Sequence, residues 1–290
     1  MSDDIVRHLR CPVCGDALSS GDGALRCAAG HSHDMARQGY VNLTAGRAPH
    51  TGDTAPMVAA RVAFLGAGHF GPLAAALIRA VAAALAGPTA LAGPTALAGP
   101  PPLIVDAGAG TGHHLAAVLD AHPQAVGLAL DASKPAVRRA ARAHPRALAA
   151  VCDVWGRLPL ADGCAAALLD VFAPRNGAEF RRALRPDGTL VVATPALDHL
   201  TELVAGLGLL RVDPEKPGRI TASLGPGWSV IGEEVVRWRL SLSRSEVATL
   251  VSMGPSARHL APAELERLVS RLPTPMAVGA AVRVTRHRPS

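Results

Sequence analysis

The sequence has few aromatic residues, no long apolar run and an odd number of cysteines. One tyrosine, three tryptophans and four phenylalanines in 290 residues argue against a large aromatic platform for stacking nucleic-acid bases. The N-terminus lacks the apolar core of a signal peptide, and no uninterrupted apolar run is long enough to span a bilayer. Five cysteines cannot all pair within one chain. We therefore expect a soluble cytoplasmic protein with reduced thiols and no membrane partner.

Three of the five cysteines lie near the N-terminus, with the spacing of a metal site. Cys11 and Cys14 form a Cys-x2-Cys pair, and Cys27 and His31 form a Cys-x3-His pair. In a reducing compartment, two such turns supply the four tetrahedral ligands of a structural Zn²⁺ ion. Cysteines without a metal are the alternative interpretation, and His33 is the alternative fourth ligand. Because no position is left for water or substrate, the spacing predicts a structural zinc ribbon.

A glycine-rich turn follows an apolar strand in the middle of the chain and precedes an amphipathic helix. Asp106, Gly108, Gly110 and Gly112 give the pattern Asp-x-Gly-x-Gly-Thr-Gly. Strand, glycine turn and helix in this order are typical of nucleotide binding. A dinucleotide fingerprint would need a glycine where His113 stands. The pattern instead resembles the first motif of S-adenosyl-L-methionine-dependent methyltransferases, in which no pyrophosphate has to be cradled.

Carboxylates at the ends of the next two strands extend this predicted site. Asp131 ends the second strand, where a carboxylate can accept both ribose hydroxyls of a nucleoside. Asp153 ends the third strand and is placed to meet an adenine amino group, with helix capping as the alternative role. Strands and helices alternate to the C-terminus. They predict an α/β fold, a Rossmann-like seven-stranded class I methyltransferase domain with a small N-terminal zinc ribbon.

The chain divides into four predicted segments. Residues 1–45 are the zinc ribbon and would recognise RNA, and residues 46–83 are a helical bridging segment. Residues 84–101 repeat the hexad Ala-Leu-Ala-Gly-Pro-Thr, which is too rich in glycine and proline for a continuous helix and predicts a linker without chemistry. Residues 102–290 form the predicted S-adenosylmethionine-binding methyltransferase domain.

Several stretches, taken in order, resemble the zinc-containing 23S rRNA (guanine-N1)-methyltransferases. They are CPVC with CAAGH, ARQGYVNL, GDTAPMVAARVAFLGAGHFGPL, VDAGAGTGHHLAAVL, APRNGAEFRRALRPDGTLVVATP and DHLTELV. The stretches SKPAVRRAARAHPRA and FAPRN resemble the Gram-positive type, which includes the tylosin-resistance methyltransferase of antibiotic producers. The resemblance covers nearly the whole chain apart from the hexad repeat. It implies methylation of guanine N1 in a 23S rRNA hairpin loop of the hairpin 35 type, resistance to tylosin-class macrolides, and a homodimer.

The resemblance also implies roles for individual residues. Phe70 stands where a tyrosine is common in the family, so a phenol hydrogen bond is absent while packing on the cofactor can persist. Thr111 replaces an acidic residue of the Gram-negative type. The implied zinc ligands are Cys11, Cys14, Cys27 and His31, and the implied cofactor contacts are Phe70, Gly110, Thr111 and His199.

The chemistry of the acceptor atom predicts a further group of residues. Guanine N1 carries a proton that must leave before or during methyl transfer, so a general base or a polarising contact to O6 would help. Asn176, Asp198 and His199 follow the fourth and fifth strands, where substrate would lie, and are predicted for the acceptor side. Because N1 lies on the Watson–Crick edge, the target guanine must be unpaired or flipped out.

The charge balance favours a polyanionic partner. Lysine and arginine total 29 against 23 acidic residues, a net charge of +6, which suits 23S rRNA. One alternative is a small-molecule methyltransferase of antibiotic biosynthesis, which the basic balance and the ribbon argue against. A second is a non-catalytic zinc-ribbon RNA-binding protein, which the intact set of Asp106, Gly108, Gly110 and Asp131 argues against.

Overall fold

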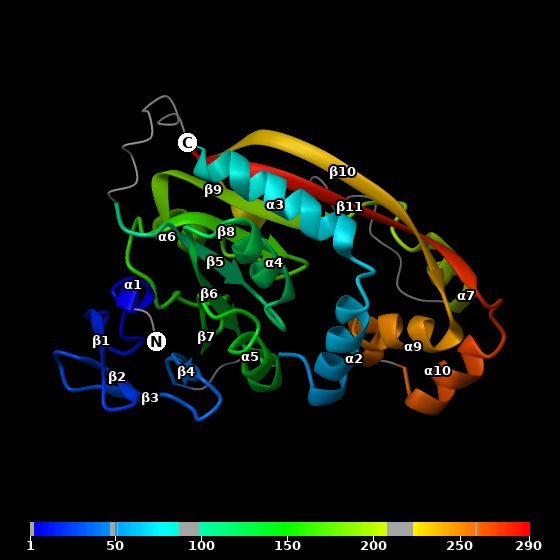
Figure 1. Ribbon diagram of the computed structural model, residues 1–290, viewed down its shortest axis with the longest axis horizontal. Coiled ribbons are helices and arrows are strands. Elements are labelled where there is room, and N and C mark those ends of the chain that lie inside the picture. Colours follow the sequence, from blue (N-terminus) through cyan, green and yellow to red (C-terminus); the bar gives the residue numbers. More distant parts are fainter. Residues whose placement is uncertain (1–2, 47–49, 51, 87–98, 208–222, 259) are drawn as a thin grey trace.

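A mixed β-sheet of eight strands runs through the centre of the molecule (Figure 1). This computed structural model describes residues 3–290 apart from 47–49, 51, 87–98, 208–222 and 259. The spatial order of the strands is β10, β11, β9, β8, β5, β6, β7, β4. Their bounds are β4 Tyr40–Asn42, β5 Leu103–Ala107, β6 Val126–Asp131, β7 Ala147–Val151, β8 Ala165–Val171, β9 Leu184–Pro195, β10 Trp228–Leu242 and β11 Met276–Pro289.

Seven of these strands are those predicted from the sequence. From β7 to β9 all neighbours are parallel, so their carboxyl ends meet at one edge of the sheet. Strand β11 is antiparallel and lies between β9 and β10. The eighth strand, β4, comes from the N-terminal segment and pairs in parallel with β7, with Tyr40 opposite Ala149. Three residues are too few for alternation to reveal a strand, which is why the sequence did not predict it.

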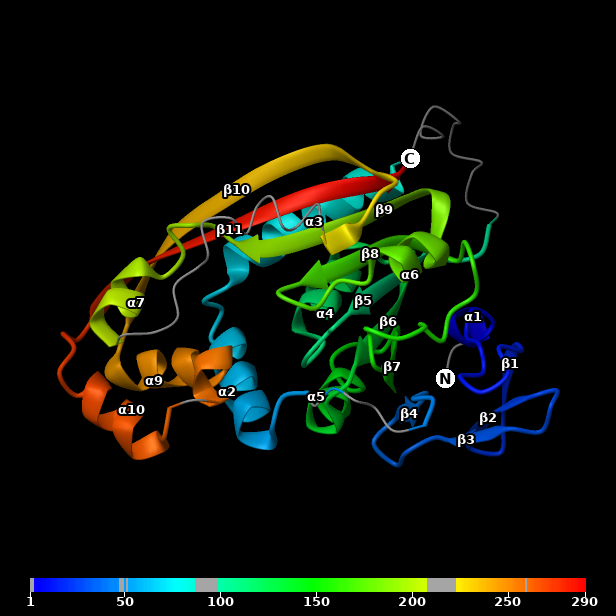
Figure 2. The ribbon, with the colours of Figure 1, turned by 180° about the vertical axis from the view of Figure 1, so that it is seen from behind.

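Helices cover both faces of the sheet because its central strands are apolar on both sides. On one face, α3 (Gly71–Leu85), α4 (His113–Ala121) and α5 (Lys134–Ala140) share a core with the sheet. On the other face lie α6 (Gly177–Ala183) and α1 (Asp3–Val6). Figure 2 shows α2 (Ala55–Gly66), α9 (Arg244–Ser252) and α10 (Pro262–Val269) gathered near one end of the long antiparallel pair β10–β11. Helix α7 (Thr201–Leu207) and the 3-10 helix η3 (Pro255–Arg258) complete the set described.

The N-terminal ribbon is a three-stranded antiparallel sheet of β1 (Leu18–Gly21), β2 (Ala24–Cys27) and β3 (Ser32–Asp34). Its buried Leu9 and Leu25 belong to the same apolar cluster as the central strands β6 and β7. Leu9 also forms an antiparallel bridge to Leu160. The ribbon is therefore packed onto the large sheet, and its segment supplies β4 to that sheet.

Two other features bear on the predicted segments. Helix α3 ends at Leu85, and residues 87–98 of the predicted linker lie outside the described residues. Among the helices that the structure describes, none alone has the length and apolar character to cross a membrane. Helices α2 and α3 meet that criterion only as a pair, and the chain bends by 84° between them.

Candidate active site and metal centre

Two tight turns of the ribbon bring three cysteines and one histidine together. Cys11 and Cys14 lie on the first turn, Cys27 ends β2, and His31 directly precedes β3. Their sulfur and nitrogen donor atoms all lie within 4.8 Å of one another. Cys14 Sγ lies 3.6 Å from Cys27 Sγ, which in turn lies 3.4 Å from His31 Nδ1. Three thiolates and one imidazole at this spacing fit a structural Zn²⁺ ion.

Glycines close both turns. Gly15 (φ +81°) donates its N–H to the Cys11 carbonyl at 2.9 Å, and Gly30 (φ +85°) donates to the Cys27 carbonyl at 3.0 Å. Left-handed backbone of this kind favours glycine. His33 lies outside the four-donor group, with Nε2 3.5 Å from Cys11 Sγ. The geometry therefore favours the predicted fourth ligand over His33, which contacts the cluster from outside.

The predicted glycine turn joins the end of β5 to the start of α4. Gly108, Gly110 and Gly112 all have left-handed backbone, with φ of +82°, +55° and +76°. A Cβ on Gly112 would lie 3.0 Å from Ala140 Cα, closer than an ordinary contact, so α5 would have to shift slightly. The Gly108 N–H donates to the Leu130 carbonyl at 2.8 Å, which fixes the turn against β6. The turn thus presents bare backbone between β5 and β6.

Asp131 at the end of β6 organises this turn. Its two carboxylate oxygens accept the N–H groups of Gly110 and Ser133, both at 2.8 Å. The Ser133 hydroxyl donates to the Asp53 carbonyl at 2.6 Å, so the chain segment before α2 is tied to the same place. Burial raises the pKa of Asp131, against the effect of these two hydrogen bonds. Each carboxylate oxygen keeps a lone pair for a further donor such as a ribose hydroxyl.

Two carboxyl groups are buried in the adjacent strands β5 and β8. Asp106 is 1% exposed, and its Oδ1 has no hydrogen-bond partner. Burial, with a smaller contribution from the charge of Asp131, raises the pKa of Asp106 to about 8. Asp170 is fully buried, and burial raises its pKa well above the usual range despite Arg175 Nε at 3.8 Å. An unpartnered buried carboxyl oxygen beside the glycine turn fits a ligand that supplies the missing hydrogen-bond partner.

The remaining predicted cofactor contacts lie near the same edge. Thr111 is buried within the glycine turn. Asp153 does not cap a helix, because a turn follows it; its Oδ1 accepts the Trp155 N–H at 3.1 Å. Its other oxygen lies 2.9 Å from His50 Nδ1.

Arg61 on α2 is a site residue that the sequence did not reveal. Its guanidinium donates to Asp53 at 2.5 Å and to the Met253 carbonyl at 2.9 Å. Its Nε is buried without a partner, and a Cβ on Gly110 would lie 3.5 Å from its Cδ. A cation therefore lies against the glycine turn. The only signal was its place in GDTAPMVAAR, a stretch of the resemblance to which no role was attached.

An aromatic cluster lies between the ends of several elements, with Phe70 at its centre. Phe70 is 3% exposed, and its ring makes edge contacts with those of Trp238, Phe172 and His199 at centroid distances of 5.3, 6.3 and 6.5 Å. The Trp238 indole N–H donates to the His69 carbonyl at 2.9 Å. This hydrogen bond fixes the position of Trp238 in the aromatic cluster. The structure therefore brings together Phe70 and His199, which lie far apart in the sequence.

Phe172 is the second residue that the sequence did not reveal. It directly follows β8 and has a left-handed backbone (φ +55°), which is strained for a bulky side chain. Its ring is 39% exposed and lies 6.3 Å from the His199 ring, with the two planes tilted by 36°. Its position in FAPRN was visible, but neither the strain nor the exposure can be read from residue types.

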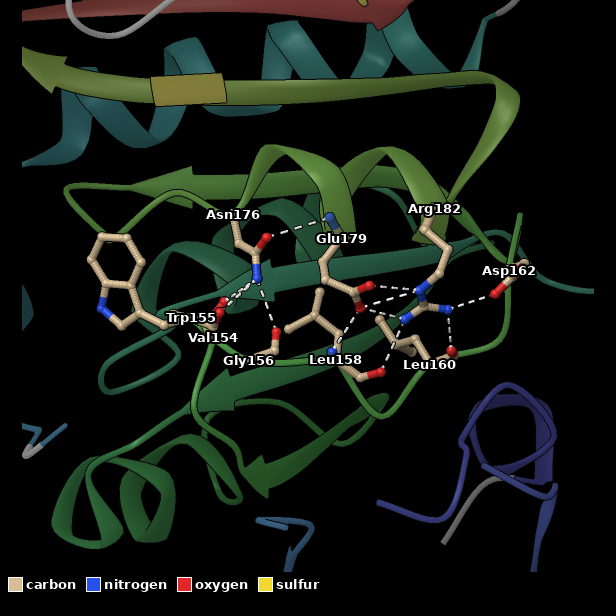
Figure 3. A network of polar contacts seen from close by, with 9 residues as sticks. All are labelled: Val154, Trp155, Gly156, Leu158, Leu160, Asp162, Asn176, Glu179 and Arg182. Carbon is tan, nitrogen blue, oxygen red and sulfur yellow. Dashed lines mark hydrogen bonds and ion pairs between the residues drawn. The ribbon is translucent and has the colours of Figure 1, made fainter. Parts of the chain in front are cut away.

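Asn176 holds neighbouring backbone (Figure 3). Its Oδ1 accepts the Glu179 N–H at 3.4 Å and caps α6. Its amide nitrogen donates to the carbonyls of Val154, Trp155 and Gly156 at 3.1, 3.0 and 2.9 Å. Both ends of the amide are thus engaged with the protein.

Asp198 and His199 differ in what they can do for an acceptor. The hydrogen bond from Arg237 Nε at 2.8 Å holds the pKa of Asp198 below its usual range, which makes this exposed carboxylate a weak base. His199 Nδ1 accepts the Ala281 N–H at 3.1 Å. An imidazole that accepts a hydrogen bond at Nδ1 carries its proton on Nε2.

Comparisons with known proteins identify relatives of this chain. Residues 9–45 match the zinc-ribbon family with the description RlmA, N-terminal. A Micromonospora griseorubida protein named for 23S rRNA (guanine-N(1)-)-methyltransferase activity is 61% identical over 296 residues, which cover 100% of both chains. The 23S rRNA (guanine(748)-N(1))-methyltransferase of Streptomyces fradiae is 52% identical over 274 residues, 94% of each chain. Among solved structures, a SAM-dependent methyltransferase from Thiobacillus denitrificans in complex with S-adenosyl-L-homocysteine is 16% identical, with a TM-score of 0.44 over 65% of this chain and 85% of that chain.

Proposed function

This chain belongs to the 23S rRNA (guanine-N1)-methyltransferase family, and we propose that it transfers the methyl group of S-adenosyl-L-methionine to N1 of an unpaired guanine in 23S rRNA. The observation that carries the proposal is the end-to-end similarity to two proteins named for this activity. The net charge of +6 supports a polyanionic partner. We place the reaction in the cytoplasm, where thiols remain reduced for zinc.

The residues around the glycine turn would hold the cofactor, which when bound supplies an electrophilic methyl group on a sulfonium. Gly110 would present its backbone to the cofactor, and Asp131 has lone pairs for the ribose hydroxyls. A Cβ on Gly108 would lie 2.4 Å from Ala173 Cβ, so that glycine lets the turn pack closely against the segment after β8. Asp153 would meet the adenine amino group. Arg61 offers a cation for the carboxylate of the methionine part.

His199 and Phe172 would act on the guanine. The His199 Nε2–H can donate to guanine O6, which draws electron density from N1 and eases the transfer of the N1 proton to solvent water as the methyl group is received. The exposed Phe172 ring offers a face on which the flipped base can stack. The Asp198 carboxylate is paired with Arg237. We therefore expect polarisation of guanine O6 by His199 to contribute more to the rate of methyl transfer than a base at position 198.

The test is methylation of a 23S hairpin transcript with S-adenosylmethionine, read by primer extension. A methyl group on N1 blocks base pairing, so reverse transcriptase should stop at one loop guanine only when the cofactor is present. From the name of the S. fradiae relative, we propose the guanine equivalent to position 748. A transcript with adenine at that position and a tRNA transcript serve as controls. Cofactor binding without any stop would favour a small-molecule acceptor instead.

Single-turnover transfer separates the residues on the acceptor side. His199→Ala should slow methyl transfer by about 100-fold or more, within the range of general acid–base contributions. Asp198→Ala should change the rate by less than about threefold because its carboxylate is already paired with Arg237. Equal losses in the two variants would overturn the assignment of His199 as the polarising group.

Two finer proposals follow from the family. We propose a homodimer, which light scattering on the purified protein tests directly. We also propose that methylation protects the ribosome against tylosin-class macrolides. Expression in a susceptible host should then raise the inhibitory concentration of tylosin, while a His199→Ala variant expressed at the same level should not.

A further inference from the structure

A cleft of about 420 Å³ lies between the zinc ribbon and the segment that follows β7. Residues 10–15 of the ribbon form one wall, and residues 152–159 form the other. The Leu9–Leu160 bridge and the hydrogen bond from the Arg10 N–H to the Pro159 carbonyl (3.0 Å) tie the walls together. The volume is within the roughly 300–1,000 Å³ of small-molecule sites.

Apolar side chains are exposed on both walls of this cleft. Trp155 is 52% exposed and Val13, on the ribbon, is 62% exposed. The indole has a ring neighbour in His50, at a centroid distance of 5.7 Å. A half-exposed tryptophan beside a second exposed apolar residue is typical of a binding surface, since the indole adds large apolar area with few rotatable bonds.

The turn that carries Trp155 is built to hold its shape (Figure 3). Asn176 donates to its three consecutive carbonyls, and Asp153 accepts the Trp155 N–H. One helical turn along α6, Glu179 accepts the Leu158 N–H at 2.8 Å. A turn fixed from several sides has little conformational freedom left to lose when a ligand binds.

The charges of the cleft suit an anionic ligand. Arg10 and Arg157 both line it. The neighbouring acids Asp162 and Glu179 form their ion pairs with Arg182. Arg10 and Arg157 act on Asp162 only at longer range, where their charges help to lower its pKa. The carboxylate in the wall, Asp153, is itself paired with His50. An aromatic face beside two arginine side chains matches the base and the phosphate of a nucleotide.

We propose that this cleft binds a second unpaired nucleotide of the substrate RNA, with its base stacked on Trp155 and its phosphate on Arg10 and Arg157. This inference rests on the proposed function because it takes RNA as the ligand. Trp155 follows β7 and Phe172 follows β8, and both strands end at the same edge of the sheet. An RNA loop with its target guanine at Phe172 can therefore extend along that edge to Trp155 and the ribbon.

The test uses the full-length zinc-loaded protein and synthetic 23S hairpins that carry 2-aminopurine at one loop position at a time. One position other than the target should lose fluorescence on binding to the wild type and regain it with Trp155→Ala. Trp155→Ala should weaken RNA affinity about tenfold or more, and Trp155→Phe less than about threefold, because a stacking face is retained. Val230→Ala, which truncates a comparably exposed residue on β10, is the matched control and should change nothing.

Two results with Trp155→Ala would count against the proposal. Unchanged RNA affinity in Trp155→Ala, with zinc content and melting temperature intact, would overturn it. So would weaker binding of S-adenosylmethionine with RNA affinity unchanged, which would make Trp155 part of the adenine pocket. If Trp155→Ala folds poorly, Arg157→Ala provides the test. It must reduce the slope of log RNA affinity against log salt concentration by about 0.7, the value for one phosphate contact to a single strand. If the wild type binds the hairpin but does not methylate it, the proposed function is contradicted. The RNA affinities and the 2-aminopurine fluorescence still test the nucleotide site in that case.

Discussion

Asp106 is a carboxyl group kept away from water beside the turn that would hold the cofactor. Burial raises the pKa of Asp106 to about 8, whereas the pKa of an aspartate in the unfolded chain is about 3.9. Between these values the folded protein holds a proton that the unfolded chain has released. The free energy of unfolding therefore falls as the pH rises through this window and levels off above it.

Asp106→Asn keeps the shape of the side chain and cannot ionise. We expect the wild type to lose stability relative to this variant by up to about 1.4 kcal/mol for each pH unit between 6 and 8. Urea unfolding of both proteins at pH 6, 7 and 8 measures the difference in their free energies of unfolding. The contributions of other titrating groups are the same in both proteins and cancel in this difference. Parallel stability curves would show that Asp106 is ionised in the folded protein.

Phe172 combines backbone strain with an exposed ring, so its replacements should follow an unusual order. Glycine is ordinarily less stabilising than alanine, but only glycine adopts φ near +55° without strain. We expect Phe172→Gly to be more stable to urea than Phe172→Ala by about 0.5–1 kcal/mol.

Both Phe172 replacements should slow single-turnover methyl transfer by about tenfold or more, because both remove the stacking face. Phe172→Tyr, which keeps the ring, serves as the control and should stay close to wild type. A normal transfer rate in the glycine variant would contradict the assigned role.

At the scale of elements, helix α6 organises the segment between β7 and β8. Asn176, Glu179 and Arg182 lie one turn apart on the same side of this helix, and each holds backbone of residues 154–160 (Figure 3). The Arg182 guanidinium also pairs with Glu179 at 2.6 Å and with Asp162 at 2.7 Å. The helix therefore positions both the Trp155 turn and the segment at Leu160, which forms a bridge to Leu9 of the ribbon.

Arg182→Ala should lower the free energy of unfolding by about 3 kcal/mol, because the Arg182 and Glu179 side chains are only 18% and 19% exposed and Glu179 would keep an unpaired charge. Arg139→Ala, an exposed arginine on α5, is the control and should cost less than about 0.5 kcal/mol. Urea denaturation measures both. A small loss in Arg182→Ala would mean that Glu179 is held by its other partners.

At the scale of the whole molecule, the ribbon and the methyltransferase sheet share one apolar cluster. Metal binding to the four ribbon ligands supplies folding free energy to a segment with little core of its own. The glycine turn and Asp131 lie in other elements, so their geometry does not depend directly on the metal.

Cys14→Ser, at the exposed metal ligand, should therefore release zinc and abolish hydrogen-exchange protection in residues 9–34. RNA affinity should fall about tenfold or more, while the affinity for S-adenosylmethionine should change less than about threefold. Cys164→Ala, a cysteine outside the ribbon, should keep one zinc per chain. Full zinc content in Cys14→Ser would contradict the four-ligand assignment.

The sequence by itself determined the features that depend on short-range pattern. The paired Cys-x2-Cys and Cys-x3-His spacings predicted donor atoms that the fold brings within 4.8 Å. The glycine turn and the alternating strands and helices predicted a sheet whose seven strands are confirmed. These features follow from neighbours along the chain, where residue type and backbone conformation are directly linked.

Only the tertiary structure decided which distant residues meet. Strand β4 is too short to show a pattern and exists because β7 offers an edge. Arg61 reaches the Met253 carbonyl across 192 positions, and Asn176 fixes the carbonyl of Trp155 from another element. Such contacts depend on how whole elements pack, because the hydrogen-bond partners of these side chains lie in distant parts of the sequence.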